Sequence, residues 1–169
     1  MENNTRKGAH NRASGLVLEK IISAACSMYH DHGQAVIMKT PEPMRPISKP
    51  DAHGRFTACF TKKAQPDFHG TVKGGRSIVI EAKHTDADRI YRRVVSDAQE
   101  EILDAHMNMG ADCYVLVSIK FKQFFMVPWI AFRDMKMYVD RFYMTPEDMK
   151  LYQVPIIDGR LHFLGEEQS

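Results

Sequence analysis

The period of the hydrophobic positions changes several times along this 169-residue chain. Apolar residues recur every three or four positions over 14–29 and 94–109, which predicts two amphipathic helices. Ser14 is suited to cap the first, and Ser96 or Asp97 could start the second later. Short β-branched and aromatic runs then predict strands, namely 34–39, 55–61, 113–121 and 124–127.

The C-terminal third predicts short elements. A helix is expected at 131–138, following Trp129, which we interpret as a core residue. Thr145 followed by Pro146 predicts another helix start, and that helix should end before Pro155. A hairpin around Asp158-Gly159 should close the fold. We therefore expect one α/β domain over 12–165, a flexible arm at 1–11, a frayed tail at 166–169, and a proline-rich protrusion at about 41–65.

The centre of the pattern is a second predicted hairpin, Phe68–Val72 and Arg76–Lys83, joined by Lys73-Gly74-Gly75. Successive side chains of a strand point to opposite faces. Glu81 and Lys83 should therefore share one face, whereas Ile78, Ile80 and Ala82 should share the other.

The position of Asp67 depends on the register of this hairpin. A two-residue loop would set Asp67 opposite Ala82, on the wrong face. A three-residue loop with a left-handed glycine pairs Val72 with Arg76 and sets Asp67 opposite Glu81. We predict this second register, or a bulge with the same effect.

Two carboxylates and an ammonium group would then converge at a strand end. The carboxylates repel each other unless a cation lies between them, and hard oxygen ligands suit Mg²⁺ or Mn²⁺. Lys83 could then stabilise charge on a phosphate. The spacing alone is equally compatible with a solvent-exposed pair of Glu81 and Lys83 on a strand. Glu19, near the rim of the first helix, is either an exposed glutamate or a third carboxylate reaching this site.

Composition narrows the classes of function only slightly. The net charge is +2, and no apolar run is long enough to span a membrane, so we expect a cytoplasmic protein. Three widely spaced cysteines without a C-x-x-C pattern indicate free thiols. His30 and His32 lack a third ligand at metal-site spacing, and we favour a loop pair without an ion. Clusters of Lys and Arg modestly favour a phosphate-rich substrate.

Pro66-Asp67 followed by Glu81-Ala82-Lys83 resembles the PD-(D/E)xK signature of the restriction-endonuclease-like nucleases. More specifically, the chain resembles the RecU-type Holliday junction resolvases of bacteria and phages. The ordered series of short blocks carries this resemblance, and the further blocks are Ala35–Pro43, Asp67–Thr85, Gln99, Gly110–Phe121 and Arg160–Leu164. Ala98 departs from the family, which has histidine at that position, and the protrusion is a few residues shorter.

The resemblance implies a mixed central sheet flanked by helices, with the protrusion as a stalk. It implies that Asp67, Glu81 and the Ala82 carbonyl bind a divalent metal, that Lys83 is catalytic, and that Gln99 orients water or a neighbouring group. Glu19 matches the helix glutamate of the wider superfamily only approximately.

The resemblance also implies a homodimer that cuts a four-way DNA junction with symmetric nicks, by phosphodiester hydrolysis that leaves a 5′-phosphate. Other branched-DNA or duplex nucleases of the same fold, and a junction-binding protein that does not cut, remain alternatives. The residues expected to contact DNA are Arg12, Lys49, Arg55, Lys62, Lys63, Lys73, Arg76, Thr85, Arg92 and Arg93.

Overall fold

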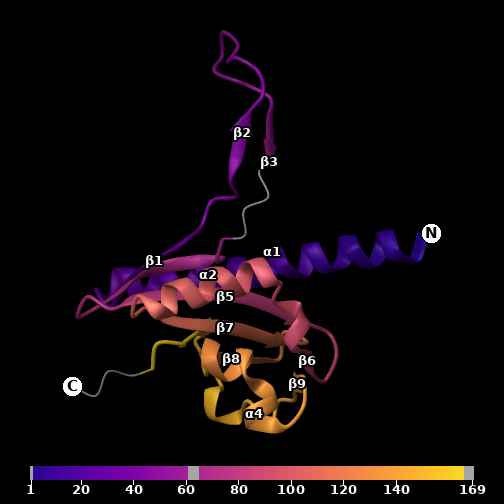
Figure 1. Cartoon of the computed structure of the whole chain (residues 1–169). Helices are drawn as coiled ribbons and strands as arrows, with labels where there is room; N and C mark the ends of the chain where they lie inside the picture. Colours follow the sequence, from indigo (N-terminus) through magenta and orange to yellow (C-terminus); the bar gives the residue numbers. More distant parts are fainter. Residues whose placement is uncertain (1, 61–64, 166–169) are drawn as a thin grey trace.

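The structure is a computed structural model that describes residues 2–60 and 65–165, with the side chains of 2–7 and Phe60 outside the described set. An α/β body carries a thin stalk that projects away from it (Figure 1). Within the described ranges, no helix combines the length and the apolar character that crossing a membrane would need.

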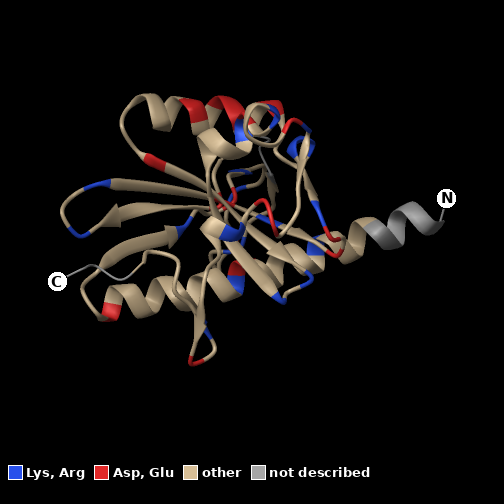
Figure 2. Cartoon of the chain, turned by 90° about the horizontal axis from the view of Figure 1, so that it is seen from below, with Lys and Arg blue, Asp and Glu red and all other residues tan. Residues whose placement is uncertain are grey.

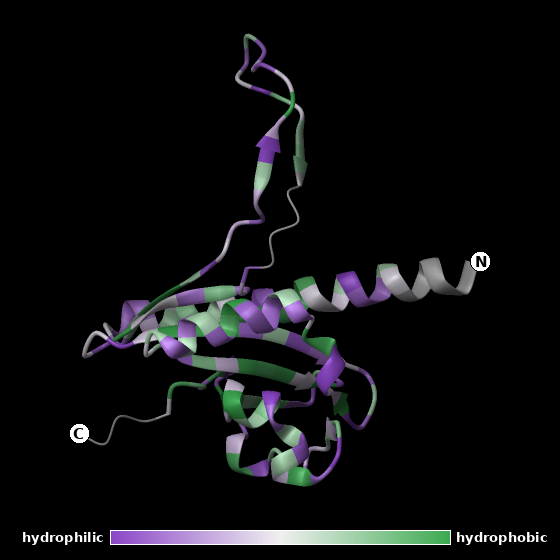
Figure 3. Ribbon diagram, in the orientation of Figure 1, coloured by the Kyte–Doolittle hydropathy of each residue, from purple (hydrophilic) through white to green (hydrophobic). Residues whose placement is uncertain are grey.

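A mixed five-stranded sheet forms the middle of the body. Its spatial order is β1 (Ala35–Lys39), β4 (Phe68–Val72), β5 (Ser77–Thr85), β7 (Asp112–Ile119) and β8 (Gln123–Pro128). Only β5 and β7 run parallel, and the crossover between them contains helix α2 (Asp97–Asn108). The other neighbouring strands are antiparallel. Hydrophobic residues are concentrated in these central strands (Figure 3).

Each face of the sheet has its own core. Helix α1 (Glu2–Asp31) packs Leu18 and Ile22 against Ile78 and Ile80 on one face. On the other face, α2, α3 (Trp129–Arg133) and α4 (Met135–Val139) enclose a cluster that contains Val79. Figure 2 shows the sheet between α1, which begins at the marked N-terminus, and the helix on its other side. The mixed α/β class, with a helix-flanked central sheet and a protruding insertion, is confirmed.

Helix α1 is longer than the pattern predicted. It begins at Glu2, so residues 2–11 are helical where we expected a flexible arm, and Ser14 lies inside the helix as a buried residue instead of capping it. The first turns extend beyond the sheet (Figure 1). An apolar period marks only the part of a helix that packs against a core, so the pattern of hydrophobic positions does not show where α1 begins.

Helix α2 takes the later of the two predicted starts. Ser96 is its N-cap, and Gln99 completes a capping box with it. The segment before it is β6 (Ile90–Tyr91) and the short 3-10 helix η1 (Arg92–Val94), and β6 pairs with β9 (Tyr143–Met144).

The helix predicted after Thr145 is absent, which corrects that expectation. The chain makes a turn and one 3-10 turn, η2 (Lys150–Tyr152). Val154 then donates its backbone N–H to Phe124, and Gln153 bridges to Phe125, so pairing beside β8 competes with a longer helix. The expected terminal hairpin forms from β10 (Ile156–Ile157) and β11 (Arg160–Leu161).

The stalk is a narrow β-ribbon. Strands β2 (Met44–Pro46) and β3 (Ala58–Phe60) pair in antiparallel fashion, and Ile47 extends the pairing by donating to the Thr57 carbonyl. At the tip, the Asp51 carboxylate accepts backbone N–H groups from His53 and Arg55, at 2.8 and 2.9 Å. These bonds lower the pKa of Asp51 and close the tip as a defined turn.

Candidate active site

The central hairpin has the register that a three-residue loop requires. Phe68 pairs with Ile80 and Thr71 with Ser77, so the same register sets Asp67 opposite Glu81. Val72 donates its N–H to the Arg76 carbonyl at 2.9 Å, and Gly74 and Gly75 have φ values of 91° and 90°. The predicted register is therefore confirmed. Glycine is needed in this loop because other residues are strained at such positive φ angles.

Asp67 is fixed just before β4 begins. Its Oδ2 accepts the backbone N–H of Ala82 at 2.8 Å, and its own carbonyl accepts the N–H of Thr40 at 2.8 Å. Burial raises the pKa of Asp67, while the Ala82 N–H and the charge of Lys83 oppose the rise. The carboxylate is thus held in place at the edge of the core.

Glu81 is the most buried charged group of the site, with a relative exposure of 1%. Its Oε1 accepts Lys83 Nζ at 2.8 Å and Gln99 Nε2 at 2.5 Å. Its Oε2 is buried without a hydrogen-bond partner among the described residues. Burial first, and then the charge of Asp67, raise the pKa of Glu81 to about 7, although Lys83 opposes this. An orphaned carboxylate oxygen of this kind is a ready ligand for a cation.

Lys83 and Gln99 complete the cluster. The Lys83 side chain is 18% exposed and also donates to Gln99 Oε1 at 3.2 Å. That same oxygen accepts the backbone N–H of Ser96, at 3.1 Å. The capping box that starts α2 therefore also positions the amide of Gln99 between Glu81 and Lys83. Four of the predicted residues, Asp67, Glu81, Lys83 and Gln99, lie together.

Glu19 lies beside this cluster but has its own partner. Lys39 Nζ is 2.5 Å from its Oε2, and the charge of Glu19 contributes to the raised pKa of Asp67. Both residues and Asp67 line a pocket of about 190 Å³ at the base of the stalk. Within the part of the chain that the structure describes, no group of three or more His, Cys, Asp or Glu side chains is arranged to hold an ion. Glu19 thus borders the site beside Asp67, and its role as a third ligand stays a prediction.

The predicted DNA-contacting residues separate into several groups. Thr85 follows Lys83 on β5, and its hydroxyl accepts the N–H of Ala87 at 3.1 Å. Lys49 and Arg55 lie in the stalk tip, and Arg55 Nε is 3.1 Å from Asp51 Oδ2. Arg12 is exposed on α1, and Lys62 and Lys63 lie outside the described residues. Lys and Arg residues are scattered over the view in Figure 2.

Lys73 and Arg76 lie away from the carboxylates. They sit at the β4–β5 turn and line a separate cavity of about 500 Å³, together with residues of the C-terminal segment such as Tyr152 and Phe163. Arg76 Nη1 is also 3.3 Å from Asp112 Oδ2. Neither residue is brought to the candidate active site.

Arg92, which we expected to contact DNA, points inward. Its Nη2 donates to Glu100 Oε2 at 2.6 Å, its Nε donates to the Arg133 carbonyl at 3.1 Å, and its guanidinium lies 5.0 Å from the ring centre of Trp129. Trp129 is fully buried, as expected. Arg92 therefore packs η1 against the core, and only its neighbour Arg93 is exposed. A basic pair in the sequence does not show which member turns inward.

The remaining expectations concern cysteine and histidine. Cys26 and Cys113 are buried free thiols, and burial raises their pKa values to about 12 and about 11, so both stay protonated. Cys59 is also free and lies on β3 of the stalk. His30 is in the last turn of α1, and His32 follows that helix.

Comparison with known proteins identifies a family that matches most of the chain. The family described as RecU, Recombination protein U, matches residues 13–155. Among solved structures, the fold is similar to that of Hjc, a Holliday junction resolvase from the archaeal hyperthermophile Archaeoglobus fulgidus. The TM-score is 0.48 at 15% identity, over 78% of this chain and 91% of that chain. No curated protein matches the chain. Because the match covers most of its length, the chain belongs to the RecU family.

Proposed function

We propose that this protein is a metal-dependent endodeoxyribonuclease that resolves four-way DNA junctions as a homodimer. One observation carries the catalytic part of the proposal. Glu81 is buried with one carboxylate oxygen held by Lys83 and Gln99, while the other has no partner and Asp67 stands across the hairpin. A carboxylate pair placed only for stability would leave a costly unpaired acceptor in the core.

The donor set fits a hard divalent cation. Asp67, Glu81 and the Ala82 carbonyl would hold it, and carboxylate and carbonyl oxygens favour Mg²⁺ or Mn²⁺ over softer metals. When bound, such an ion lowers the pKa of water and offsets negative charge on a phosphate. It would also offset the negative charge of Asp67, which after burial is the second cause of the raised pKa of Glu81.

Other residues of the chain would stabilise the reacting phosphate and hold the site in shape. In hydrolysis, water attacks phosphorus, the bond to the 3′-oxygen breaks, the 3′-oxygen takes up a proton, and the phosphate stays on the 5′ end. Lys83 Nζ, fixed by Glu81 and Gln99, would place a positive charge beside the phosphate as its negative charge increases. Gln99 would hold Glu81 and Lys83 in their relative positions. Glu19 and Lys39 would form the wall of the site beside Asp67.

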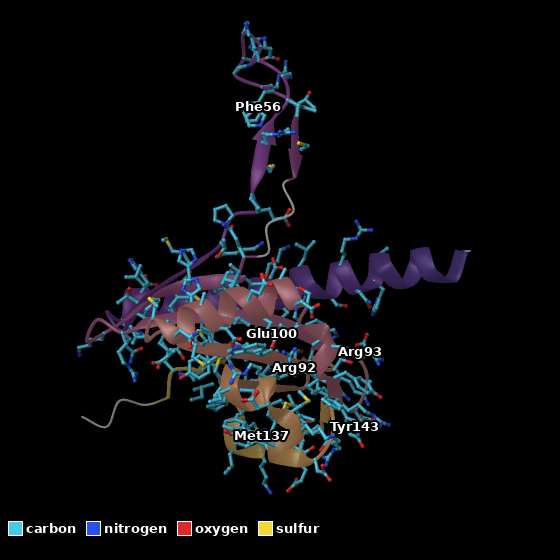
Figure 4. All side chains as sticks on the ribbon, viewed as in Figure 1. Phe56, Arg92, Arg93, Glu100, Met137 and Tyr143 are labelled. Atoms are coloured by element: carbon cyan, nitrogen blue, oxygen red, sulfur yellow. The ribbon has the colours of Figure 1, made fainter. Side chains whose placement is uncertain are left out.

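Selectivity for branched DNA would come from outside this cluster. The matched family is described as a recombination protein, and Hjc is described as a Holliday junction resolvase. The stalk projects from the body near the pocket that Asp67 lines, and the exposed Phe56 lies on its outer part (Figure 4). Arg55, the preceding residue, is also exposed. A projection of this kind suits the open centre of a four-way junction. A two-fold homodimer would place two equivalent sites on opposite strands, as symmetric nicking requires.

The test compares a synthetic four-way junction, a Y-fork and a linear duplex, each with Mg²⁺ and with EDTA. We expect paired nicks in the four-way junction, only with Mg²⁺, and none with Asp67→Asn, which should still bind the junction. Equal cutting of linear duplex would indicate a duplex nuclease. Tight junction binding without cutting in Mg²⁺ or Mn²⁺ would indicate a binding protein. Loss of binding in Asp67→Asn would mean that Asp67 is structural.

A further inference from the structure

A basic and aromatic surface lies on the two-stranded β6–β9 ribbon. We call it the ribbon surface, and it consists of Arg89, Tyr91, Arg93 and Tyr143. Tyr91 pairs with Tyr143 across the ribbon, with ring centres 5.6 Å apart, and the next pair is Ile90 with Met144. Ile90 and Met144 are 1% and 2% exposed, so the alternation of a strand turns the tyrosines outward.

The ribbon is fixed firmly to the body. Its inner pair belongs to the core cluster around Val79 and Trp129. Immediately after β6, Arg92 is held by Glu100 and by the Arg133 carbonyl. Figure 4 shows this arrangement, with Arg92 beside Glu100 and with Arg93 and Tyr143 at the side of the body. The surface is therefore preorganised.

Each exposed guanidinium of the ribbon surface lies over a tyrosine ring. Arg93 is 4.6 Å from the centre of the Tyr91 ring, and Arg89 is 5.0 Å from that of Tyr143. A guanidinium stacked on a ring keeps the N–H groups at its rim available as donors. This arrangement presents planar donors instead of bare aromatic faces.

Within the described part of the chain, Arg89 and Arg93 are held in no direct ion pair, although the charge of the adjacent Asp88 carboxylate interacts with Arg89. Asp88 is bound instead by Lys120. Arg141, the second guanidinium near Tyr143, differs because Asp148 holds it. Two exposed guanidinium groups of this kind on a rigid support are suited to a polyanion.

The ribbon surface is also connected to the candidate active site. Residues 86–96 join the end of β5, which carries Lys83 and Thr85, to the start of α2, which carries Gln99. Three of its four residues, Arg89, Tyr91 and Arg93, therefore lie on the segment that links two residues of the cluster.

We infer that Arg89 and Arg93 bind the phosphate backbone of a DNA arm leading to the cleavage site. This inference rests on the proposed function. The rings of Tyr91 and Tyr143 are already occupied by guanidinium groups, so they support the arginines and do not stack on bases. Backbone contacts position DNA without reading its sequence.

The test measures binding of a four-way junction and of a linear duplex of the same sequence between about 50 and 200 mM salt. Asp67→Asn serves as the background, so that cleavage does not intervene. Adding Arg89→Gln and Arg93→Gln should weaken both complexes roughly tenfold and reduce the slope of log K against log[salt] by about 2, since each lost phosphate contact removes about 1. Arg89→Lys with Arg93→Lys should restore the slope.

A charge-matched control is Lys150→Gln with Arg160→Gln, two exposed residues of the C-terminal segment. It should leave affinity and slope unchanged. The inference is overturned if the two arginine changes leave the salt slope unaltered, or if the control lowers it equally. Failure of the proposed function is distinct, because the protein without the Asp67 substitution would then bind the junction without cutting it.

Discussion

Gln99 Nε2 donates to Glu81 Oε1 across 2.5 Å, and the other atom of the same amide accepts from Lys83. The neutral side chain of Gln99, on α2, therefore fixes both the Glu81 carboxylate and the Lys83 ammonium group of β5. Because the Ser96 N–H holds that amide oxygen as well, the helix start and the site share one hydrogen-bond network.

Gln99→Leu should lower the rate of junction cleavage by about 10–100-fold, since losing a group that orients a metal-ligand side chain has effects of this size. Junction affinity should stay within about twofold of the unsubstituted protein, because Gln99 is only partly exposed and carries no charge. Gln123→Leu, an exposed glutamine at the start of β8, is the matched control and should cut normally. A comparable loss of binding would show that the substitution disturbs the fold of α2.

The raised pKa of Glu81 predicts how stability changes with pH in the metal-free protein. A carboxyl group whose folded pKa is about 7, against 4.5 in its ordinary state, favours folding below pH 4.5, and this contribution is lost as pH rises through 7. In EDTA, the protein should lose about 1–3 kcal/mol relative to Glu81→Gln between pH 5.5 and 8.5. Thermal unfolding of both proteins across this range measures the difference.

Mg²⁺ should reverse that loss at pH 8.5, because a ligand that binds only the folded state stabilises it. Glu81→Gln should show a much smaller response to the same Mg²⁺ concentration. A difference between the two proteins that does not vary with pH would contradict the assignment of the raised pKa to Glu81.

The sequence predicted the arrangement of the site better than its surroundings. Strand alternation and loop length were enough to set Asp67 opposite Glu81, because both rules are local and the loop has two adjacent glycines. Ser96, one of the two later starts predicted for the second helix, is its N-cap. The contact between Gln99 and Glu81 was not predictable from spacing, since it depends on how α2 packs over the sheet.

The features that the sequence did not predict depend on contacts between distant parts of the chain. Two-residue strands such as β6 and β9 are too short to show a period, so the pairing of Tyr91 with Tyr143 could not be predicted. The inward position of Arg92 depends on Glu100 and Trp129, which lie on other elements. Long-range packing decided both outcomes.

Gly70→Ala should destabilise the protein by about 1–3 kcal/mol, a range typical of forced overpacking. A methyl group at Gly70 would lie 2.0 Å from the Val36 carbonyl oxygen and 2.6 Å from the Ile37 Cα, so β1 and β4 would have to separate. Gly15→Ala is the control, because nothing lies within 4 Å of its added carbon and it lies inside α1. That change should be neutral or stabilising by up to about 1 kcal/mol in urea unfolding. Similar changes in unfolding free energy for the two substitutions would mean that β1 moves away from β4 at little energetic cost.

Shortening the stalk should reduce the preference for junctions more than it reduces affinity for duplex DNA. Ser48 accepts the backbone N–H of Thr57, and the β2–β3 register continues outward to Ser48 and Phe56. Replacing Lys49–Arg55 by Asn-Gly therefore closes the ribbon with a two-residue turn and keeps its lower part. The ratio of junction to duplex affinity should fall at least about tenfold, if the tip reads the junction centre and not only phosphates.

Lys49→Gln with Arg55→Gln removes the positive charges of the tip and keeps its length. This variant should weaken junction and duplex binding together, since its effect is on backbone contacts, and their ratio should change little. If the ratio of junction to duplex affinity is unchanged in the shortened protein, the stalk does not recognise junction shape. A falling ratio in the charge variant alone would reassign that role to Lys49 and Arg55.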